Sequence, residues 1–244
     1  QQAVLSDEGN KRVVLGEGYG SDILKHAPYP VTTPSADRNE LKFWMVNDIH
    51  GRDSVFRLLI GDAPKQKPDF VCLNGDLLNS IESEEALFAG FLASASELLT
   101  PAGIPLVVTR GNHDGRGKFA RHWLDYFPTP TGESYYTFRR GPVFFVVLDG
   151  CEDKPDSDIR YYGLSTTDAY REQEARWLKG VVESEEYRAA PLHIVVLHMI
   201  PGGKSSWHGE QEIRRLFVPI LNEASVDIML CGHYHRYQWI DDGS

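Results

Sequence analysis

The sequence predicts an α/β protein with a mixed β-sheet, because short apolar runs alternate with helical segments over most of the chain. The runs are rich in Val, Ile, Leu and Phe, which is typical of strands that are covered on both faces. The expected strands are residues 41–47, 70–74, 106–109, 143–148, 194–197 and 228–230.

The segments between these runs have the residue spacing of amphipathic helices. The expected helices are residues 54–61, 84–99, 118–126, 169–183 and 209–224. In the second of them, Leu87, Phe91 and Ala95 recur on one face, which forms a stripe that would lie against a sheet. Residues 135–139 precede a Gly-Pro turn and the run at residue 143, which predicts an antiparallel hairpin beside the other strands.

The first 39 residues differ in composition from the rest of the chain. Residues 3–6 and 11–15 each contain a short apolar run and flank a polar turn, which predicts a β-hairpin. Residues 26–39 contain three prolines and many polar residues, as in a linker. We therefore expect residues 1–39 to form a hairpin and extended arm, or the tail of an upstream β module, and residues 40–244 to form the main domain.

The charge and hydropathy of the chain exclude some functions. Among 244 residues, 35 are acidic and 25 basic, giving a formal net charge of -10, and no cluster of Lys and Arg marks a surface for long nucleic acid. A small anionic ester is compatible with this charge if metal ions supply positive charge locally. No run of about 18 or more apolar residues is present, so no transmembrane segment is expected.

Localisation and oligomeric state are not assigned by the sequence. The chain begins at Gln1 rather than at a methionine, which is compatible with the removal of a signal peptide. Export of a bacterial protein to the periplasm or the medium is one expectation.

Side chains that bind metals or transfer protons follow five of the expected strands, at the carboxyl end of each. These residues are Asp48, His50, Asp76, Asn112, His198, His233 and His235. Open α/β sheets bind ligands at the carboxyl ends of their strands, so we expect all of them to meet at one edge. Residues two apart in an extended segment face the same way, so Asp48 with His50, and His233 with His235, can each approach one centre together.

These side chains offer more oxygen and nitrogen donors than a single tetrahedral zinc with an open position accepts. Two metal ions that share a carboxylate would use all of them. With carboxylate, amide and imidazole donors and no thiolate, the set suits Mn, Fe, Zn or Co, and the sequence does not choose among these. A lone histidine after a strand is more often a hydrogen-bonded structural residue, but five such segments together favour a metal centre.

The same residues, in their order along the chain, resemble the motifs of the calcineurin-like metallophosphoesterases. The family pattern D-x-H, G-D, G-N-H-D/E, a lone His and G-H-x-H is met at residues 48–50, 75–76, 111–114, 198 and 232–235. The resemblance covers residues 41–239. It implies a four-layer sandwich in which two mixed β-sheets are flanked by helices, with a dimetal site at the carboxyl ends of the strands.

The resemblance also implies which residues bind each ion. Asp48, His50 and His235 would bind one ion, and Asn112, His198 and His233 would bind the other. Asp76 would bridge the two ions.

The later part of the chain also resembles the purple acid phosphatases, through residues 177–178 and 235–237. The chain departs from their D-x-G and G-D-x-x-Y motifs, because His50 stands where they have glycine and Asn79 where they have tyrosine. We therefore expect no strong visible absorption from a tyrosine bound to Fe(III). Relatives usually continue with further strands after G-H-x-H, so we expect a main domain that is short at its C-terminus, or a second sheet that residues 1–25 complete.

The function that the resemblance implies is metal-dependent hydrolysis of a phosphate monoester or diester on a small substrate. Two ions about 3.5–4 Å apart would hold a bridging hydroxide and neutralise the charge of the phosphoryl group. His113 is not needed as a ligand, so we expect it to protonate the leaving oxygen, with Asp114 fixing its tautomer. The alternative is a catalytically idle, metal-stabilised module that uses the same fold to bind a partner.

Five more residues adjoin these segments and are candidate substrate contacts. Arg52, Arg110 and Arg236 would bind phosphate oxygens, and Trp207 and His208 would contact the rest of the substrate. Each of them is equally well explained as a structural or surface residue.

Overall fold

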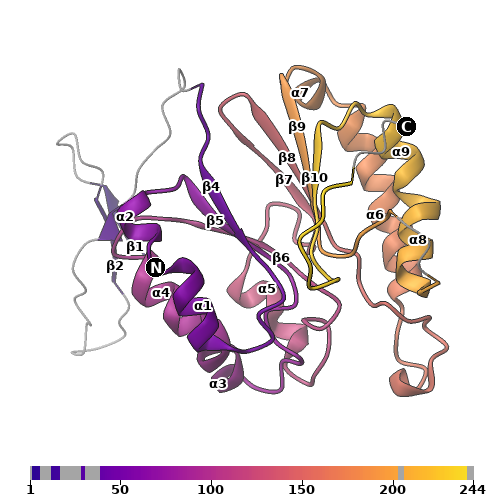
Figure 1. Cartoon of the computed structure of the whole chain (residues 1–244), viewed down its shortest axis with the longest axis horizontal. Helices are drawn as coiled ribbons and strands as arrows, with labels where there is room; N and C mark the ends of the chain where they lie inside the picture. Colours follow the sequence, from indigo (N-terminus) through magenta and orange to yellow (C-terminus); the bar gives the residue numbers. More distant parts are fainter. Residues whose placement is uncertain (1, 6–11, 17–28, 31–38, 203–205, 241–244) are drawn as a thin grey trace.

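The computed structural model describes residues 2–5, 12–16, 29–30, 39–202 and 206–240. Its main part consists of two β-sheets that face each other, with helices on the outer face of each sheet (Figure 1). This arrangement confirms the predicted α/β sandwich of two sheets flanked by helices.

The first sheet is parallel and has the order β4-β5-β6. Its strands are β4 (Phe43–Val46), β5 (Phe70–Asn74) and β6 (Leu106–Thr109). Every residue of β5 is buried, because this strand has a neighbour on each edge and a packed layer on each face.

The second sheet is mixed and has the order β10-β9-β8-β7. Strands β8 (Val143–Leu148), β9 (Leu192–Leu197) and β10 (Ile228–Leu230) are parallel. β7 (Tyr136–Arg140) runs antiparallel to β8, as the hairpin sequence predicts.

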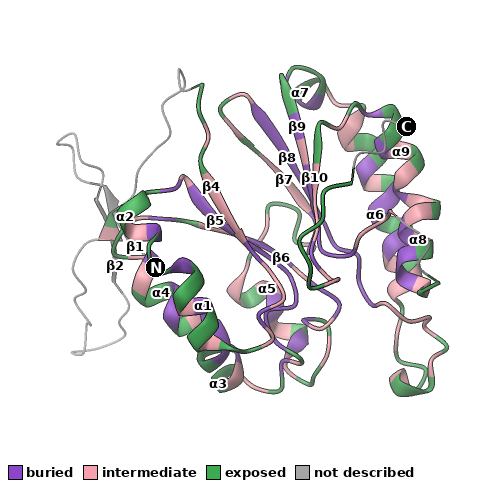
Figure 2. Cartoon of the chain, in the orientation of Figure 1, coloured by how far each residue is buried: buried purple, intermediate pink, exposed green. Residues whose placement is uncertain are grey.

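Helices cover the outer face of each sheet, and their residues alternate between buried and exposed positions (Figure 2). The first sheet is covered by α1 (Asp53–Ile60), α2 (Ala63–Gln66) and α4 (Ala93–Leu99). The second sheet is covered by α6 (Thr167–Val182), α7 (Glu185–Arg188), α8 (His208–Leu216) and α9 (Val218–Glu223).

Successive side chains of a strand point to opposite faces of the sheet, so each strand contributes residues to two layers of the core. Val71 and Leu73 of β5 pack with the helices of the first sheet, whereas Phe70 and Cys72 pack against Phe145 and its neighbours from the second sheet. The two sheets therefore share a buried interface of their own.

Three predicted helices differ in detail from the structure. Residues 84–99 form α3 (Glu84–Leu87), a π-helical turn η1 (Phe88–Leu92) and α4. In that turn Gly90 packs closely on Leu78, since a Cβ there would lie 3.0 Å from a Leu78 methyl carbon. Residues 118–126 form a 3₁₀ turn η2 (Ala120–His122) and the short α5 (Trp123–Tyr126).

The predicted helix at residues 209–224 is two helices, α8 and α9. Pro219 lies in the first turn of α9, and a proline has no amide hydrogen with which to continue the preceding helix. The chain therefore turns between them.

The N-terminal strands form a small sheet of their own, with the order β1-β2-β3. β1 (Gln2–Leu5) pairs antiparallel with β2 (Arg12–Gly16), as the predicted hairpin requires, and β3 (Tyr29–Pro30) adds to β2. The described strands of this region therefore do not complete the second sheet, and that expectation is wrong for them. Most of the predicted linker at residues 26–39 lies outside the described residues, and the boundary near Glu40 stays a prediction.

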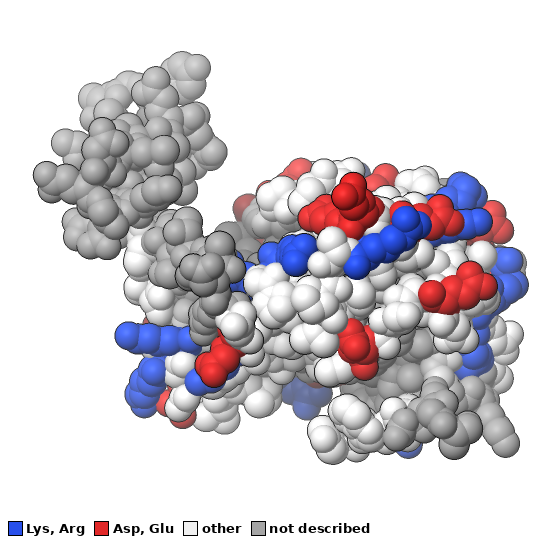
Figure 3. Space-filling model, turned by 90° about the horizontal axis from the view of Figure 1, so that it is seen from above, with Lys and Arg blue, Asp and Glu red and all other residues white. Residues whose placement is uncertain are grey.

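Two surface properties agree with the composition. On the face shown in Figure 3, Lys and Arg side chains lie among Asp and Glu side chains, without an extended basic surface on the part that is coloured. Within the described ranges, no helix combines the length and the apolar character that crossing a bilayer requires.

Candidate metal centre

The seven predicted ligands lie on five loops that leave the carboxyl ends of β4, β5, β6, β9 and β10. These strand ends point to the same lower edge of the two sheets in Figure 1. Asp48 and His50 follow β4, and Asp76 follows β5. Asn112, His198 and the pair His233 and His235 follow β6, β9 and β10.

Five of these residues have a left-handed backbone. The angle φ is 55° at Asp48, 48° at His50, 52° at Asp76, 76° at His233 and 51° at His235. Such a conformation costs a residue other than glycine about 1–3 kcal/mol and persists only where the surrounding structure enforces it. Strain that is concentrated on neighbouring polar residues is typical of a functional site.

Hydrogen bonds hold the strained loops together. The amides of Asp48 and His50 donate to the carbonyl oxygens of Gly75 and Asp76, at 3.0 Å in each case. The amide of His233 donates to Asp48 Oδ2 at 3.0 Å, which joins the last of these loops to the first.

Two glycines allow the loops after β5 and β6 to approach each other. Gly75 has a φ of +79°, and a Cβ at this position would lie 2.6 Å from His198 Nδ1 and 2.7 Å from the amide nitrogen of Gly111. A Cβ on Gly111 would collide with the backbone of Asp76. Only glycine fits at either position, so both glycines of the sequence motifs have a packing reason.

The first group of side chains consists of Asp48, His50 and His235. His235 Nε2 lies 3.2 Å from Asp48 Oδ1 and 3.1 Å from His50 Nε2. The three ligand atoms are close enough to hold one metal ion.

The second group consists of Asp76, His198 and His233, whose ligand atoms lie within 4.8 Å of one another. His198 Nε2 lies 3.2 Å from Asp76 Oδ2. The same Asp76 oxygen lies 3.9 Å from His50 Nε2 in the first group. Asp76 is therefore between the two groups, as a shared carboxylate must be.

Several buried atoms at this site have no hydrogen-bond partner among the described residues. They are Asp48 Oδ1, Asn112 Oδ1 and His198 Nε2. A buried polar atom without a partner costs about 1–3 kcal/mol, so this concentration indicates a bound species that supplies the missing interactions. Oxygen and imidazole donors of this kind suit first-row divalent ions, and the residues therefore fit a metal pair.

The charges at the site shift the pKa values of its residues. Burial opposes protonation of His198, but the Asp76 carboxylate 3.2 Å from its Nε2 and the charge of Asp48 outweigh burial and raise its pKa to about 8. Burial favours the neutral form of Asp76, but His198 and the amide of His113 lower its pKa to about 2.

Burial also lowers the pKa of His50, and lowers that of His233 to about 4. These two imidazoles are therefore neutral at pH 7, which is the form that binds metals. His198 retains a proton in the absence of a metal, so we expect metal binding to release it.

His113 lies beside these ligand groups, with its ring centroid 4.9 Å from that of His50, and it also has a ligand atom close enough to share an ion with His50 and Asp76. Its Nδ1 lies 2.9 Å from the carbonyl oxygen of Asn79. Because a carbonyl oxygen only accepts, Nδ1 carries the hydrogen and Nε2 is the nitrogen available for proton transfer. Arg116 Nη1 lies against the same ring, 3.1 Å from Nδ1 and 3.2 Å from Nε2.

The expectation that Asp114 orients His113 is wrong. Asp114 is fully buried, and its Oδ1 accepts hydrogen bonds from the amides of Leu77 and Leu78 at 2.9 and 3.2 Å. Its Oδ2 accepts from the amide of Gly111 at 2.9 Å. The carboxylate turns inward and joins the loops after β5 and β6, while the carbonyl oxygen of Asn79 takes the orienting role.

We expect Asp114→Asn to lower the free energy of unfolding of the metal-free protein by about 1–3 kcal/mol, because the amide group cannot accept from all three donors. Urea denaturation measures this loss, and Asp125→Asn, at a mostly exposed carboxylate, is the matched control with a change below about 0.5 kcal/mol. An unchanged denaturation midpoint for Asp114→Asn would show that these bonds do not stabilise the loops.

Two of the candidate substrate contacts are engaged elsewhere. Arg110 Nη2 lies 2.5 Å from Asp149 Oδ2, and Asp149 is fully buried. A buried carboxylate needs its cation, so the assignment of Arg110 to phosphate is wrong. His208 Nε2 lies 2.7 Å from Asp168 Oδ1 and joins the start of α8 to α6, which explains His208 without a substrate.

The other three candidates have different surroundings. Trp207 is half exposed, and its ring lies 5.0 Å from that of His233, so it lies at the rim of the ligand groups. Arg236 lies over the ring of Tyr234 at 5.2 Å and lines a separate groove. Arg52 is exposed at the start of α1. Within the described part of the chain, no recorded contact joins Arg52 or Arg236 to a predicted ligand.

Sequence reasoning missed three residues beside the predicted ones. Arg116 contacts His113 and pairs with Glu152 through Nε and Nη2 at 2.5 and 2.9 Å. Arg116 lies only three residues after His113 in the sequence, and this short separation could have identified it as a neighbour of the site. Glu210 is fully buried and has an oxygen 3.6 Å from His233 Nε2, but it lies on a helix that no motif marks.

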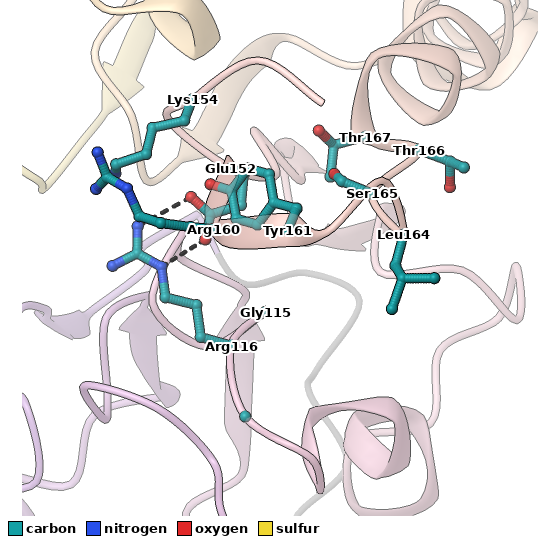
Figure 4. Close-up of a pocket in the computed structure, with 11 residues that line it drawn as sticks. Gly115, Arg116, Glu152, Lys154, Arg160, Tyr161, Leu164, Ser165, Thr166 and Thr167 are labelled. Atoms are coloured by element: carbon teal, nitrogen blue, oxygen red, sulfur yellow. Dashed lines mark hydrogen bonds and ion pairs between the residues drawn. The ribbon is translucent and has the colours of Figure 1, made fainter. Parts of the chain in front are cut away.

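A cavity of about 610 Å³ adjoins Arg116 (Figure 4). It lies among residues 115–117, residues 152–154, the 3₁₀ turn η3 (Ile159–Tyr161) and the segment that leads into α6. Because Arg116 both lines this cavity and contacts the ring of His113, the cavity lies beside the expected proton donor.

Comparison with known proteins identifies relatives of the chain. The family model described as calcineurin-like phosphoesterase matches residues 41–237. The serine/threonine-protein phosphatase CPPED1 of Bos taurus is 27% identical over 184 residues, which is 70% of this chain and 54% of that protein. Purple acid phosphatase 23 of Arabidopsis thaliana is 24% identical over 147 residues, 55% of this chain and 29% of that protein. The chain thus spans about half the length of the first of these relatives, and less of the second.

Solved structures share the fold at lower sequence identity. A dimetal phosphatase from Danio rerio superimposes with a TM-score of 0.55 at 14% identity, over 79% of this chain and 80% of that one. GAP50, described as the anchor in the inner membrane complex of Plasmodium, gives a TM-score of 0.52 at 16% identity, over 79% and 65%.

Proposed function

Because the chain belongs to the calcineurin-like phosphoesterase family, we propose that it is a dinuclear, metal-dependent hydrolase of phosphate esters. The observation that carries this proposal is that ligand-type side chains from the ends of five strands meet at one place, where several of them have buried atoms without protein partners or a strained backbone. A structural role would satisfy such atoms within the protein.

Each predicted ligand has a place in this proposal. Asp48, His50 and His235 would hold one ion, Asn112, His198 and His233 would hold the other, and Asp76 would contribute to both. Two ions bound there would supply positive charge to the phosphoryl oxygens and make water a nucleophile at neutral pH.

The remaining steps belong to residues around the ligands. In this proposal the imidazolium form of His113 donates its Nε2 hydrogen to the oxygen that leaves phosphorus, and it keeps the Nδ1 hydrogen that the carbonyl oxygen of Asn79 accepts. Trp207, half exposed beside His233, restricts the approach of the substrate from its side.

The substrate is a small phosphate ester in this proposal. The curated relatives bear the names of phosphatases, which favours a monoester over a diester. The acidic net charge of -10 disfavours a long polyanion.

Hydrolysis of p-nitrophenyl phosphate and bis-p-nitrophenyl phosphate tests the proposal. After metal removal and addition of Mn, Fe, Zn or Co, we expect turnover that a chelator abolishes, with the monoester preferred. Bound metal without turnover of either ester would contradict the proposal and would favour an idle binding module of the same fold.

A further inference from the structure

The cavity beside Arg116 is asymmetric in its chemistry. Figure 4 shows the charged ends of Arg116, Lys154 and Arg160 gathered on one side, with Tyr161 between them and the side where Leu164 lies. Its volume of about 610 Å³ is in the range of about 300–1,000 Å³ that is typical of small-molecule sites.

All three cations have acidic partners, and Lys154 and Arg160 still keep hydrogen-bond donors. Arg116 is fully engaged by Glu152 and Asp153. Lys154 pairs with Asp153 through its ammonium group, which has three donors.

Arg160 is the most accessible of these cations. Its Nε lies 3.1 Å from Asp158 Oδ1, and its side chain is 66% exposed. A guanidinium has five donors, so its two Nη groups remain able to bind an anion in the cavity.

The position of the cavity relative to His113 indicates what enters it. In an in-line displacement the group that leaves phosphorus must lie beside the residue that protonates it. Arg116 contacts the His113 ring and lines the cavity, so the alcohol part of a substrate held at the metal centre would extend into this space.

We propose that this cavity binds the leaving group of the phosphate ester, and that the preferred leaving group carries an anion of its own, a carboxylate or a second phosphate. This inference rests on the proposed function, and it adds the chemical class of the substrate. Arg160 and Lys154 bind the second anion, and the Arg116–Glu152 pair lines the side of the cavity that faces His113.

A set of matched aryl esters tests this proposal. Phenyl phosphate and 4-carboxyphenyl phosphate have leaving groups of similar acidity but different charge, and hydroquinone bisphosphate offers a phosphate in place of the carboxylate. We expect kcat/KM to be about 10-fold higher for the charged esters, which is the value of one hydrogen bond to a charged group. The charged ester with the higher kcat/KM shows whether the cavity prefers a carboxylate or a phosphate.

Variants test whether the cations cause this preference. We expect the double variant Lys154→Gln with Arg160→Gln to lose the preference, so that its kcat/KM becomes equal for charged and neutral esters. The matched control Lys179→Gln removes an exposed charge near the end of α6 and should keep the preference. Equal kcat/KM for charged and neutral esters in the parent protein, or a preference that survives in the double variant, would overturn the proposal.

Binding of the product tests the cavity independently of turnover. We expect 4-hydroxybenzoate to bind the protein about 10-fold more tightly than phenol, and the double variant to bind both equally. If no ester is hydrolysed, the proposed function fails, and this binding comparison alone then supports or overturns the cavity assignment.

A second inference concerns Glu210, which lies in α8 and is fully buried. Its Oε2 accepts a hydrogen bond from the hydroxyl of Tyr234 at 2.9 Å. Its Oε1 has no hydrogen-bond partner among the described residues, and it lies 3.6 Å from His233 Nε2, which also has none. Two buried atoms of complementary type thus face each other slightly beyond hydrogen-bond distance.

Glu210 is outside the groups of residues that could share an ion. His233 groups with Asp76 and His198, and no group among the described residues includes Glu210. The carboxylate is therefore placed behind the histidine as seen from the other ligands. Histidines that bind metals commonly donate their second N–H to a carboxylate in this position.

We infer that Glu210 is a positioning residue, which accepts the hydrogen of His233 Nε2 and leaves Nδ1 as the atom that binds the ion. Tyr234 holds the carboxylate in place through Oε2. This contact fixes both the tautomer and the direction of the ring.

Metal affinity tests this role without reference to activity. We expect Glu210→Ala to weaken the binding of one of the two ions by about 10- to 100-fold and to leave the other unchanged. Glu210→Gln keeps an acceptor oxygen and should restore most of the affinity. Glu174→Gln, at a second fully buried carboxylate, controls for general loss of stability.

Nitrogen NMR of the zinc-loaded parent protein is a second test that needs no variant. We expect His233 to carry its hydrogen on Nε2 and the ion on Nδ1. An ion on Nε2, or parental affinity for both ions in Glu210→Ala, would overturn the inference.

Discussion

Asp76→Asn is expected to lower kcat/KM for phosphate esters by at least about 100-fold, because the positive charge of bound ions is worth several kcal/mol in the transition state. Asp76 lies between the two groups of ligands, with Oδ2 3.2 Å from His198 Nε2 and 3.9 Å from His50 Nε2. An asparagine has one acceptor oxygen and no charge, so it cannot serve two cations. The metal content of the variant should fall together with its activity.

The metal-free protein gives a second readout of the same substitution. The contact with Asp76 is a main reason why the pKa of His198 is about 8 despite burial. Without that carboxylate charge, burial dominates, and we expect the pKa of His198 to fall toward or below its ordinary value of 6.5. NMR titration measures this change, and Asp125→Asn, at a mostly exposed carboxylate that pairs with His122, should leave His198 unchanged.

Two outcomes would contradict this role of Asp76. One is a variant that binds two ions with parental affinity. The other is a variant that loses activity only because it is unfolded, which circular dichroism of the metal-free protein detects. We expect the fold to persist, since asparagine keeps the shape of the side chain and removes a charge beside Asp48.

His113→Ala is expected to reduce kcat by about 100- to 10,000-fold on alkyl phosphates, which need a proton on the leaving oxygen. The loss should be much smaller for p-nitrophenyl phosphate, because nitrophenolate leaves without protonation. The physical basis is the position of Nε2 beside the ligand groups, with Arg116 Nη1 3.2 Å from it and with Nδ1 held by the carbonyl oxygen of Asn79 at 2.9 Å.

The dependence on the leaving group separates proton donation from other roles of His113. An equal loss on both kinds of ester would show that His113 binds metal or phosphate instead. His122→Ala is the matched control, because His122 pairs with Asp125 on the surface and should leave both rates unchanged.

The fold was predictable to a large extent from the periodicity of apolar residues. Strands β5, β6, β8 and β10 have the predicted boundaries, because buried strands are continuous apolar runs that end where polar loops begin. The π-helical turn at Phe88–Leu92 was not predictable in this way. It depends on the contact between Gly90 and Leu78, which lie on different segments.

The ligand groups were predictable because sheet topology brings strand ends together whatever the directions of individual side chains. The roles of the residues next to the ligands were not predictable, because adjacency in the sequence does not fix the direction in which a side chain points. His113 and Asp114 are consecutive, yet the first faces the ligands and the second binds three amides inside the loop. Arg110 is likewise next to a motif but pairs with Asp149.

Glu210 could not be identified from the sequence, because it is close to the ligands in space but not in the chain. It lies 23 positions before His233 in the sequence, on a helix without a recognisable motif. Only the packing of α8 against the loop after β10 brings its carboxylate to the imidazole.

A metal titration of the metal-free protein, with turnover measured in the same samples, tests the central claim most directly. If these loops form a dinuclear hydrolytic centre, binding saturates at two ions per chain and phosphate ester hydrolysis reaches its maximum at that ratio. Saturation at one ion per chain, or two bound ions without hydrolysis of any ester, would contradict it.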